Sequence, residues 1–441
     1  MKGNGIGTTT IPSPLETTKR NKPRKRPSMP SSSSEPQLHT NLPRRNDNNS
    51  TFSACLLVMD DNHYLIEWLA YHYHTLPLRY LVIAVDPRSK TSPHSILKRW
   101  HPHHMTIVQW NDTHFLPKSW LKRLAANTNN NTNNNNTNNN NILEHDSIAK
   151  FVLHRERQRN FYPTCFAALK YVGRSWTLVS DIDEFIQINP NYYIYNNNNM
   201  DPIHNHSTST TTTTTTTHHH HHHHQRPTVI ESIWDHYHQQ QQDNNINNTL
   251  TNPPPCITIP RLQFGNYEQP PINTNDTTNA TTTTTSTSAT SYTSYAPHGF
   301  HDSDFLTLRW HWRAGLHSRK DNRNPKSIIN LQQIPVQDLS REQTDAHRPV
   351  RTVCLKQHLY QLNRNSPWII HHYIGTEQQY FFRNDARLGL KQRNRQRFQD
   401  YQHIQTAYDD SISGWLQHFV TTYGEKQSHL WLDGVGNVSI I

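Results

Sequence analysis

The sequence predicts an α/β domain built around a mostly parallel central sheet. Three apolar runs of strand length, at residues 52–59, 79–85 and 105–110, are separated by segments whose apolar residues recur at helical intervals. This alternation of strand and helix is typical of a parallel sheet. A fourth apolar run, at 176–179, ends abruptly in acidic residues. Carboxylates in that position lie where open α/β sheets bind their ligands.

The remaining elements follow in order along the chain. The first strand leads into a helix over 65–73 that ends at Leu76-Pro77, and Thr91 or Ser92 opens a second helix that runs through Trp100. Later we expect a helix at 148–172 that Pro163 can interrupt, strands at 256–264, 305–312, 326–331 and 368–373, and helices at 381–403 and 413–423.

Low-complexity segments divide the 441 residues. We expect residues 1–51 to form a disordered basic tail and residues 52–436 to form one domain, interrupted by Asn-, Thr-, His- and Gln-rich inserts at 127–141, 196–252 and 270–297. The His run follows a Thr run inside an insert, so we interpret it as an expansion without a catalytic role. The folded part is then large enough for one sizeable α/β domain.

The chain is basic, with a formal net charge of +10 and a pI near 9.3. Part of the excess lies in the N-terminal tail, which is either solvated or contacts membrane phosphates, RNA or an import receptor. No apolar run approaches the ~20 residues that span a bilayer, and no signal peptide is visible at Met1. We therefore expect a soluble chain without a transmembrane segment, unless an anchor precedes Met1.

Four cysteines lack the close spacing of a zinc site. Cys55 and Cys165 lie in or beside predicted core elements, and Cys256 and Cys354 lie in the later half. They are either buried thiols or, in an oxidising lumen, the partners of one or two disulfides.

The acidic turn at 181–184 is the strongest functional signal. In an extended segment, residues i and i+2 point to the same side, so Asp181 and Asp183 can hold one divalent cation between them. The phosphates of a sugar nucleotide would complete its coordination. The alternative interpretation is a polar strand end that caps the next helix.

Several separate blocks resemble one enzyme family. LLVMDDNHYLIEWLAYHYHTLPLRYLVIAVDPRS, HRERQRNFYPTCFAALKYVGRSWTLVSDIDEFI, CITIPRLQFG, KSIIN and HHYIGTEQQYFFRNDAR are similar, in this order, to blocks of the family 92 and related family 2-like glycosyltransferases. The resemblance covers roughly residues 52–436. One departure is the turn Met59-Asp60-Asp61-Asn62, where Lys-Asn-Glu-like residues are expected.

The resemblance implies a GT-A-type fold, a nucleotide-sugar-binding α/β sandwich that transfers a sugar, here expected to be a hexose, from a UDP- or GDP-sugar to a glycan or glycoconjugate acceptor. It also implies Mn²⁺ or Mg²⁺ as cofactor, with Asp181 and Asp183 as the DxD-type ligands, and a Golgi or endomembrane lumen as the location. The chemistry is consistent, because a divalent cation and basic side chains stabilise the charge that develops on a departing nucleoside diphosphate.

Other candidate residues are assigned with their alternatives open. Asp86 either accepts hydrogen bonds from uracil or ribose or only initiates the turn before Pro87. His371 or His372 supplies a late metal ligand or is a satisfied strand-end histidine. The cationic candidates for the diphosphate, each of which can instead be solvated, are Lys326, Arg383 and Arg387.

The base that activates the acceptor is not marked by any spacing. Glu268, Asp302 and Asp304 lie in the appropriate part of the chain, and an inverting mechanism needs one such carboxylate. Two other classes of function remain as alternatives: a non-catalytic family member that acts as a binding module, and a basic nucleic-acid-binding protein. We expect no nucleic-acid partner, because the sequence contains no RNA- or DNA-binding motif.

Overall fold

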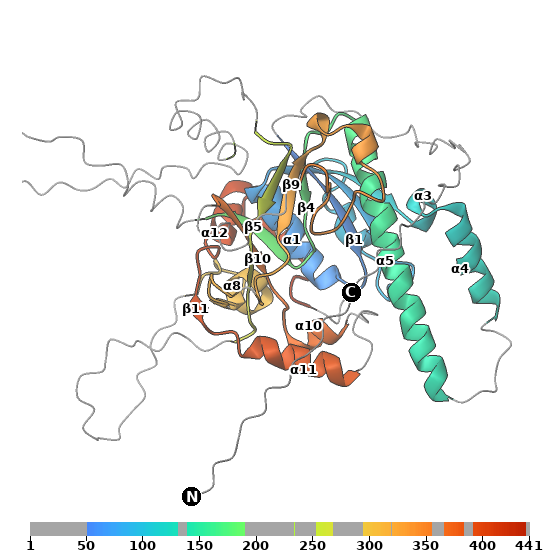
Figure 1. The fold of residues 1–441 in the computed structure, drawn as a ribbon. Helices are drawn as coiled ribbons and strands as arrows, with labels where there is room; N and C mark the ends of the chain where they lie inside the picture. The colour runs from blue at the N-terminus through green and yellow to red at the C-terminus, as the bar shows by residue number, and fades with distance from the viewer. Residues whose placement is uncertain are drawn as a thin grey trace, which may run out of the picture. The chain divides into compact units, whose positions relative to one another are not determined.

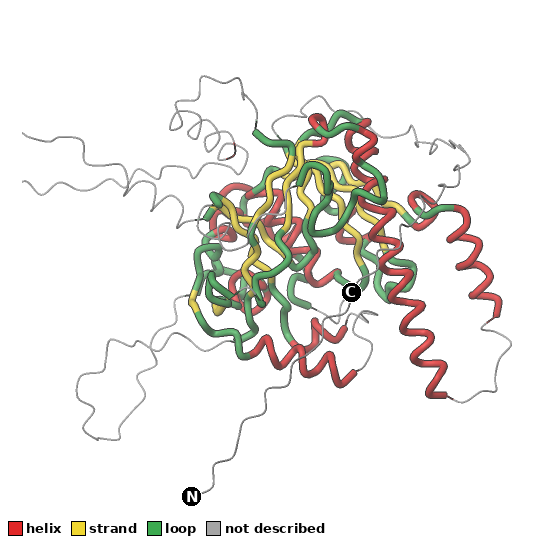
Figure 2. The backbone as a smooth tube through the Cα atoms, viewed as in Figure 1, coloured by secondary structure: helices red, strands yellow, loops and turns green. Residues whose placement is uncertain are grey.

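The structure is a computed structural model that describes residues 51–130, 139–189, 233, 253–267, 294–318, 320–354, 366–382 and 391–437. These residues belong to one compact unit. Their helices and strands form an α/β arrangement in which a central sheet is covered by helices (Figures 1 and 2).

The central sheet has six strands in the order β3-β2-β1-β4-β9-β6. Its first four members are parallel to one another: β1 (Phe52–Val58), β2 (Leu78–Val85), β3 (Thr106–Trp110) and β4 (Trp176–Val179). β9 (Lys326–Asn330) runs antiparallel to β4, and β6 (Cys256–Ile259) runs antiparallel to β9. The mostly parallel sheet that the sequence predicts is therefore confirmed.

Two small sheets accompany the central one in the described residues. A three-stranded sheet has the order β5-β10-β7 and contains β5 (Glu184–Ile188), β10 (Trp368–His372) and β7 (Arg261–Gln263). A two-stranded sheet pairs β8 (Trp312–Arg313) with β11 (Ala407–Tyr408). Only four residues separate the end of β4 from the start of β5, so the acidic turn joins the central sheet to its neighbour.

The described helices are α1 (Asn62–Thr75), α2 (His94–Lys98), α3 (Asp112–Phe115), α4 (Lys118–Asn130), α5 (Asn139–Tyr171), α8 (Leu306–Arg309), α10 (Glu377–Phe382), α11 (Lys391–Gln402), α12 (Trp415–Tyr423) and α13 (Glu425–Leu432). Three 3₁₀ helices are η1 (Asp302–Asp304), η2 (Leu331–Gln333) and η3 (Val336–Asp338).

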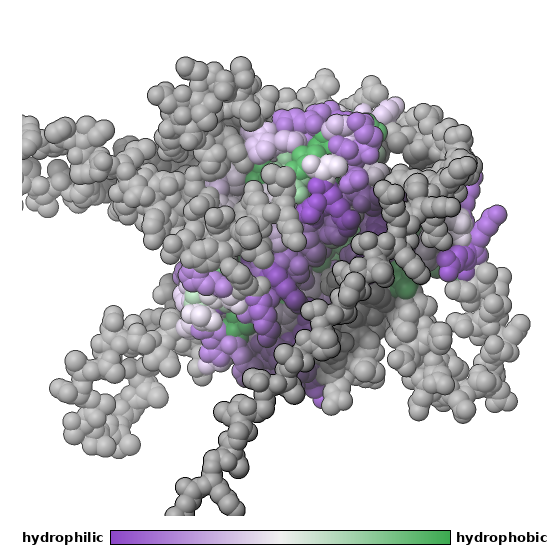
Figure 3. Space-filling view, in the orientation of Figure 1, coloured by the Kyte–Doolittle hydropathy of each residue, from purple (hydrophilic) through white to green (hydrophobic). Residues whose placement is uncertain are grey.

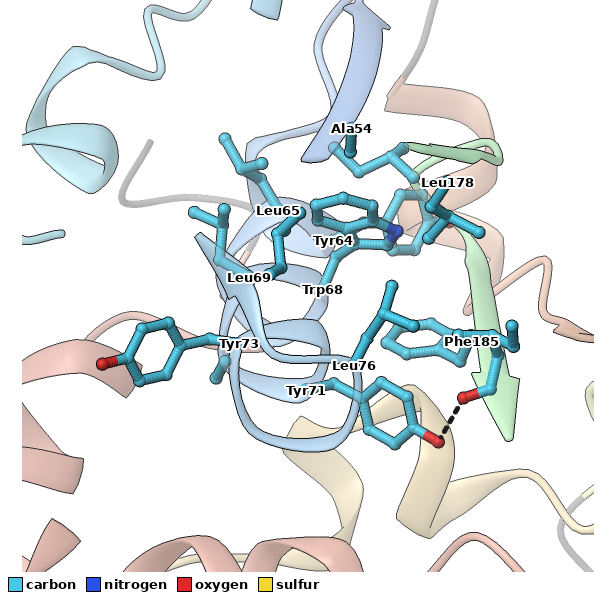
Figure 4. Close-up of a cluster of buried hydrophobic side chains, with 14 of the residues drawn as sticks. Ala54, Tyr64, Leu65, Trp68, Leu69, Tyr71, Tyr73, Leu76, Leu178 and Phe185 are labelled. Carbon is cyan, nitrogen blue, oxygen red and sulfur yellow. Dashed lines mark hydrogen bonds between the residues drawn. The ribbon is translucent and has the colours of Figure 1, made fainter. Parts of the chain in front are cut away.

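Each face of the central sheet has its own hydrophobic cluster, because side chains alternate along a strand. On β1, Ala54 and Leu56 belong to the cluster that includes α1, α12 and α13, whereas Cys55 faces the cluster that includes α5. Figure 4 shows the first cluster, in which the Tyr71 hydroxyl donates a hydrogen bond of 2.8 Å to the carbonyl oxygen of Ile186. This bond ties α1 to β5.

Three predicted elements differ from the structure. The expected strand at 305–312 is instead the single helical turn α8 followed by β8. The run at 256–264 divides at Pro260 into β6 and β7, which lie in different sheets. α5 continues through Pro163 without a break, and α4 and α5 both extend into the ends of the Asn-rich tract that was expected to be an insert.

All four cysteines form disulfides, Cys55–Cys165 and Cys256–Cys354. The first joins β1 to α5 within the second hydrophobic cluster. The second joins β6 to the segment that follows η3.

The described surface in Figure 3 is mostly hydrophilic, with hydrophobic residues only in small patches. Exposed large hydrophobic side chains are scattered: Val152, Tyr171, Val336, Phe381 and Leu430. None of the helices in the described ranges has the length and apolar character needed to cross a membrane.

Candidate functional site at the carboxyl edge of the sheet

The strand order places a topological switch point between β1 and β4. The chain proceeds from β1 outward to β2 and β3, then returns to β4 on the other side of β1. Open α/β sheets bind ligands in the crevice at such a point, outside the carboxyl ends of the strands. Because β2 and β4 are both parallel to β1, Asp86 and Asp181 lie at the same edge of the sheet, as the sequence predicts.

A buried lysine lies directly beneath Asp181. β9 is antiparallel to β4, with Ser327 opposite Val179, so β9 begins where β4 ends. Lys326 Nζ is 2.7 Å from Asp181 Oδ2 and 3.1 Å from Glu184 Oε2. Burial opposes the charged form of Lys326, but the two carboxylates outweigh it and raise the pKa of the ammonium. Lys326 therefore stays charged and is held by the acidic turn.

Glu184 holds the turn together from the inside. Its side chain is fully buried, and Oε2 accepts a hydrogen bond from the backbone N–H of Asp181 at 2.8 Å. Its other oxygen lies 3.4 Å from the guanidinium of Arg261 on β7. Two buried cations thus balance the charge of Glu184 and that of Asp181.

His372, not His371, lies beside Asp183. In the antiparallel pairing of β10 with β5, His372 is opposite Glu184, and its Nε2 is 3.6 Å from Asp183 Oδ2. Adjacent residues of a strand point to opposite sides, so His371 faces away from the acidic turn. It packs against the Phe264 ring with centroids 4.5 Å apart, and burial lowers its pKa to about 4.

The tautomer of His372 bears on what can bind there. The amide nitrogen of Gln263 donates to the carbonyl oxygens of Phe264 and His372, so its Oε1 is the acceptor for His372 Nδ1–H at 2.6 Å. This assignment directs Nε2 at the Asp183 carboxylate. His372 Nε2 and Asp183 Oδ2 lie 3.6 Å apart, a spacing at which both atoms can coordinate one metal ion.

A divalent cation fits the chemistry of these side chains. Asp181 and Asp183 supply carboxylates, His372 supplies an imidazole, and Mn²⁺ accepts both ligand types. Within the described ranges, no three acidic, His or Cys side chains already converge on one metal position. A bound metal would therefore complete its coordination with substrate phosphate and water, as Mg²⁺ commonly does.

Asp86 lies in a buried network of arginines. Its Oδ1 accepts from the backbone N–H and Nε of Arg88, and its Oδ2 accepts from Arg157 at 3.0 Å. Arg157 also contacts the Asp112 carboxylate with two nitrogens. Although burial opposes ionisation, Arg88 and Arg157 hold the pKa of Asp86 below its usual value. In this structure Asp86 anchors α5 and the loop after β2 to the carboxyl edge.

The turn after β1 is also buried and internally bonded. Asp60 has a positive φ of 56° and accepts hydrogen bonds from the backbone N–H groups of Lys90 and Thr91, while Asp61 accepts from Met59. Asp60 thus fixes the loop after β2 at this edge, and Asp61 closes the turn after β1. Strained backbone of this kind is common at ligand sites.

A cavity of about 520 Å³ opens beside Asp181. α5 and the segment 341–351 form its other walls, with the lining residues Arg155, Gln158, Arg159, Asp181, Arg341, Glu342, Thr344, Asp345, Ala346, His347 and Arg351. The lining contains four arginines and three carboxylates. This combination suits an anionic ligand that binds together with a metal ion. Burial, with the nearby charge of Lys326, lowers the pKa of His347 to about 4, so its imidazole is neutral at pH 7.

The other predicted site residues lie elsewhere. Asp302 organises a loop by accepting hydrogen bonds from Ser294 and from the backbone of Tyr295 and Ala296, and neither Asp302 nor Asp304 lines the cavity. The candidates Glu268, Arg383 and Arg387 lie outside the described residues.

Sequence reasoning missed the arginines of the cavity. Arg155 and Arg159 belong to the block HRERQRNF and lie one helical turn apart, which places them on one face of α5. That spacing was a usable signal. Arg341, His347 and Arg351 belong to a segment without periodicity, and only the tertiary fold brings them to Asp181.

Comparison with known proteins adds no assignment, because no protein-family model matches this chain and no curated protein does.

Proposed function

We propose that this chain is a GT-A-type glycosyltransferase that moves a sugar, with a hexose as the expected group, from a nucleoside-diphosphate donor to a glycan or glycoconjugate acceptor. One observation carries the proposal. At the switch point of an α/β sheet, Asp181 of the acidic turn lines a cavity walled by arginines, and Asp183 of the same turn lies beside His372. That combination suits a diphosphate and a divalent cation.

The residues have distinct roles in this proposal. Asp181, Asp183 and His372 hold Mn²⁺ or Mg²⁺, which supplies positive charge against the departing diphosphate. Arg155, Arg159 and the other cavity arginines add fixed cations on the same side. The rigid turn positions these charges before the substrate arrives, so little reorganisation accompanies the reaction.

The acceptor hydroxyl needs a carboxylate within hydrogen-bond reach. Glu342 and Asp345 both line the cavity, but Asp345 is engaged by the backbone N–H of His347 and, at 3.4 Å, by Arg351. We propose Glu342 as the better placed base, ahead of Asp302 and Asp304.

A non-catalytic nucleotide-binding protein is the second candidate. The observation that favours it is the contact of Asp181 with Lys326, which already neutralises one proposed metal ligand. Such a protein would bind the nucleotide without turning over the sugar donor.

A donor screen separates the two candidates. UDP- and GDP-sugars are incubated with the protein and Mn²⁺, and released nucleotide is measured without acceptor. An enzyme releases nucleotide only with metal, and Asp183→Ala abolishes the release. Asp433→Ala is the matched control, since Asp433 is exposed, pairs with Arg99 and lies outside the cavity. Binding of UDP without turnover of any donor would favour the non-catalytic protein.

A further inference from the structure

The acidic turn is built over a cation that solvent does not reach. The side chain of Lys326 is 1% exposed, whereas that of Asp181 is 38% exposed. Lys326 therefore contacts the buried side of the turn, and the cavity borders its open side. A ligand in the cavity meets Asp181 and not Lys326, so the predicted role of Lys326 as a direct diphosphate contact does not suit its position.

Buried cations already balance the carboxylates of Asp181 and Glu184 without a metal. Lys326 and Arg261 supply two positive charges to Asp181 and Glu184. A divalent cation that binds Asp181 then meets the ammonium on the far side of the same carboxylate. The repulsion between the two cations weakens metal binding by the free protein. A diphosphate offsets that repulsion, because its negative charge enters the cavity with the metal.

We propose that Lys326 is a positioning residue that fixes Asp181 from below and suppresses metal binding until a nucleoside diphosphate arrives, so that metal and diphosphate bind together. This inference rests on the proposed function for the identity of the diphosphate. The effect of Lys326 on metal binding by the nucleotide-free protein does not depend on the proposed function and is tested separately.

The test measures Mn²⁺ binding by the electron paramagnetic resonance signal of free Mn²⁺, in the full chain without nucleotide and then with UDP. Lys326→Met removes the charge and keeps most of the volume. Its Mn²⁺ affinity without nucleotide should rise by about tenfold, and the further gain on adding UDP should shrink. Lys326→Arg keeps the charge and should stay within about twofold of the original protein.

Arg261→Met is the matched control, because Arg261 contacts the same Glu184 but not Asp181. It removes an equal charge from the buried network and should raise Mn²⁺ affinity much less than Lys326→Met. A merely structural role for Lys326 predicts the opposite pattern, in which both variants weaken Mn²⁺ binding together.

If circular dichroism shows that Lys326→Met does not fold, the double variant Lys326→Met/Glu184→Gln replaces it. That variant leaves no fully buried carboxylate without its partner, and its Mn²⁺ affinity should still rise by about threefold or more. An unchanged or weaker affinity in the folded variant overturns the inference. Absence of UDP binding with or without Mn²⁺ would instead count against the proposed function and leave the Lys326 result intact.

Discussion

The Cys256–Cys354 disulfide lies just past the C-terminal end of the segment 341–351, which lines the cavity. Removal of this disulfide should therefore weaken ligand binding. Cys354 follows Arg351 by three residues and is tied to β6 in the central sheet. The segment 341–351 is also held to α5 by the contact of Arg341 with Glu156 at 2.6 Å and by Val350, which packs in the hydrophobic cluster that includes α5. We expect this segment to open locally in Cys256→Ala/Cys354→Ala.

The other disulfide provides a control that should stabilise the fold by nearly the same free energy. The two bonds close loops of 98 and 110 residues. In the chain-entropy account, a disulfide that closes a loop of this length stabilises the fold by about 4.7 kcal/mol. The two values are nearly equal because the entropy of loop closure in the unfolded chain grows only with the logarithm of loop length. Cys55→Ala/Cys165→Ala should therefore lose about as much free energy of unfolding as the first pair. It leaves the cavity segment tied to β6.

The assay combines urea unfolding with calorimetric binding of UDP and Mn²⁺ under conditions where both variants are folded. The Cys256/Cys354 variant should lose about tenfold in affinity, equal to about 1.4 kcal/mol, and the Cys55/Cys165 variant should stay within about twofold. Equal losses in both variants would show that the disulfide acts only on global stability, which would refute the reasoning.

Two further predictions concern buried charge. Burial lowers the pKa of His72 to about 3 and of His371 to about 4, from 6.5. As the pH falls, the unfolded chain binds protons at these histidines before the folded protein does. The free energy of unfolding is therefore highest above pH 6.5 and decreases as the pH drops toward the pKa values of the folded protein. Urea unfolding at pH 7 and pH 5 should show a loss of roughly 2 kcal/mol for each histidine, and His371→Gln should reduce this loss. Arg157→Met should cost about 3–5 kcal/mol, because it leaves Asp86 and Asp112 without a buried partner, and Arg157→Lys should recover only part of that loss in the same assay. A cost below about 1 kcal/mol for Arg157→Met would contradict the buried network.

The parallel strands were predictable because each is a short apolar run bounded by polar residues. β1, β2, β3 and β4 all form where the sequence indicates, and parallel pairing then brings Asp86 and Asp181 to one edge. This outcome needed only the alternation of strand and helix.

The run at 305–312 forms a helical turn in place of the predicted strand because this turn depends on a distant residue. The Glu67 carboxylate accepts hydrogen bonds from the N–H groups of Leu306 and Thr307, and so caps the N-terminus of α8 from α1. The alternation of apolar residues within 305–312 does not reveal this cap, because Glu67 is distant in sequence. Tertiary contact overrode the strand propensity here.

The sequence could not decide between His371 and His372 for a related reason. His371 and His372 are adjacent, and a shift of one residue in register exchanges the faces of a strand. Only the pairing of β10 with β5 decides which imidazole meets Asp183. The cavity was equally hidden, because its walls come from α5 and from a segment almost two hundred residues later.

The central claim is that a nucleoside diphosphate binds at the carboxyl edge between β1 and β4, beside Asp181. A crystal structure of the full chain with UDP and Mn²⁺ tests it most directly. The account predicts a manganese ion on Asp181, Asp183 and His372, with the diphosphate in the cavity of about 520 Å³ beside Arg155 and Arg159. Diphosphate density away from this edge, or a manganese ion bound without either aspartate, would contradict it.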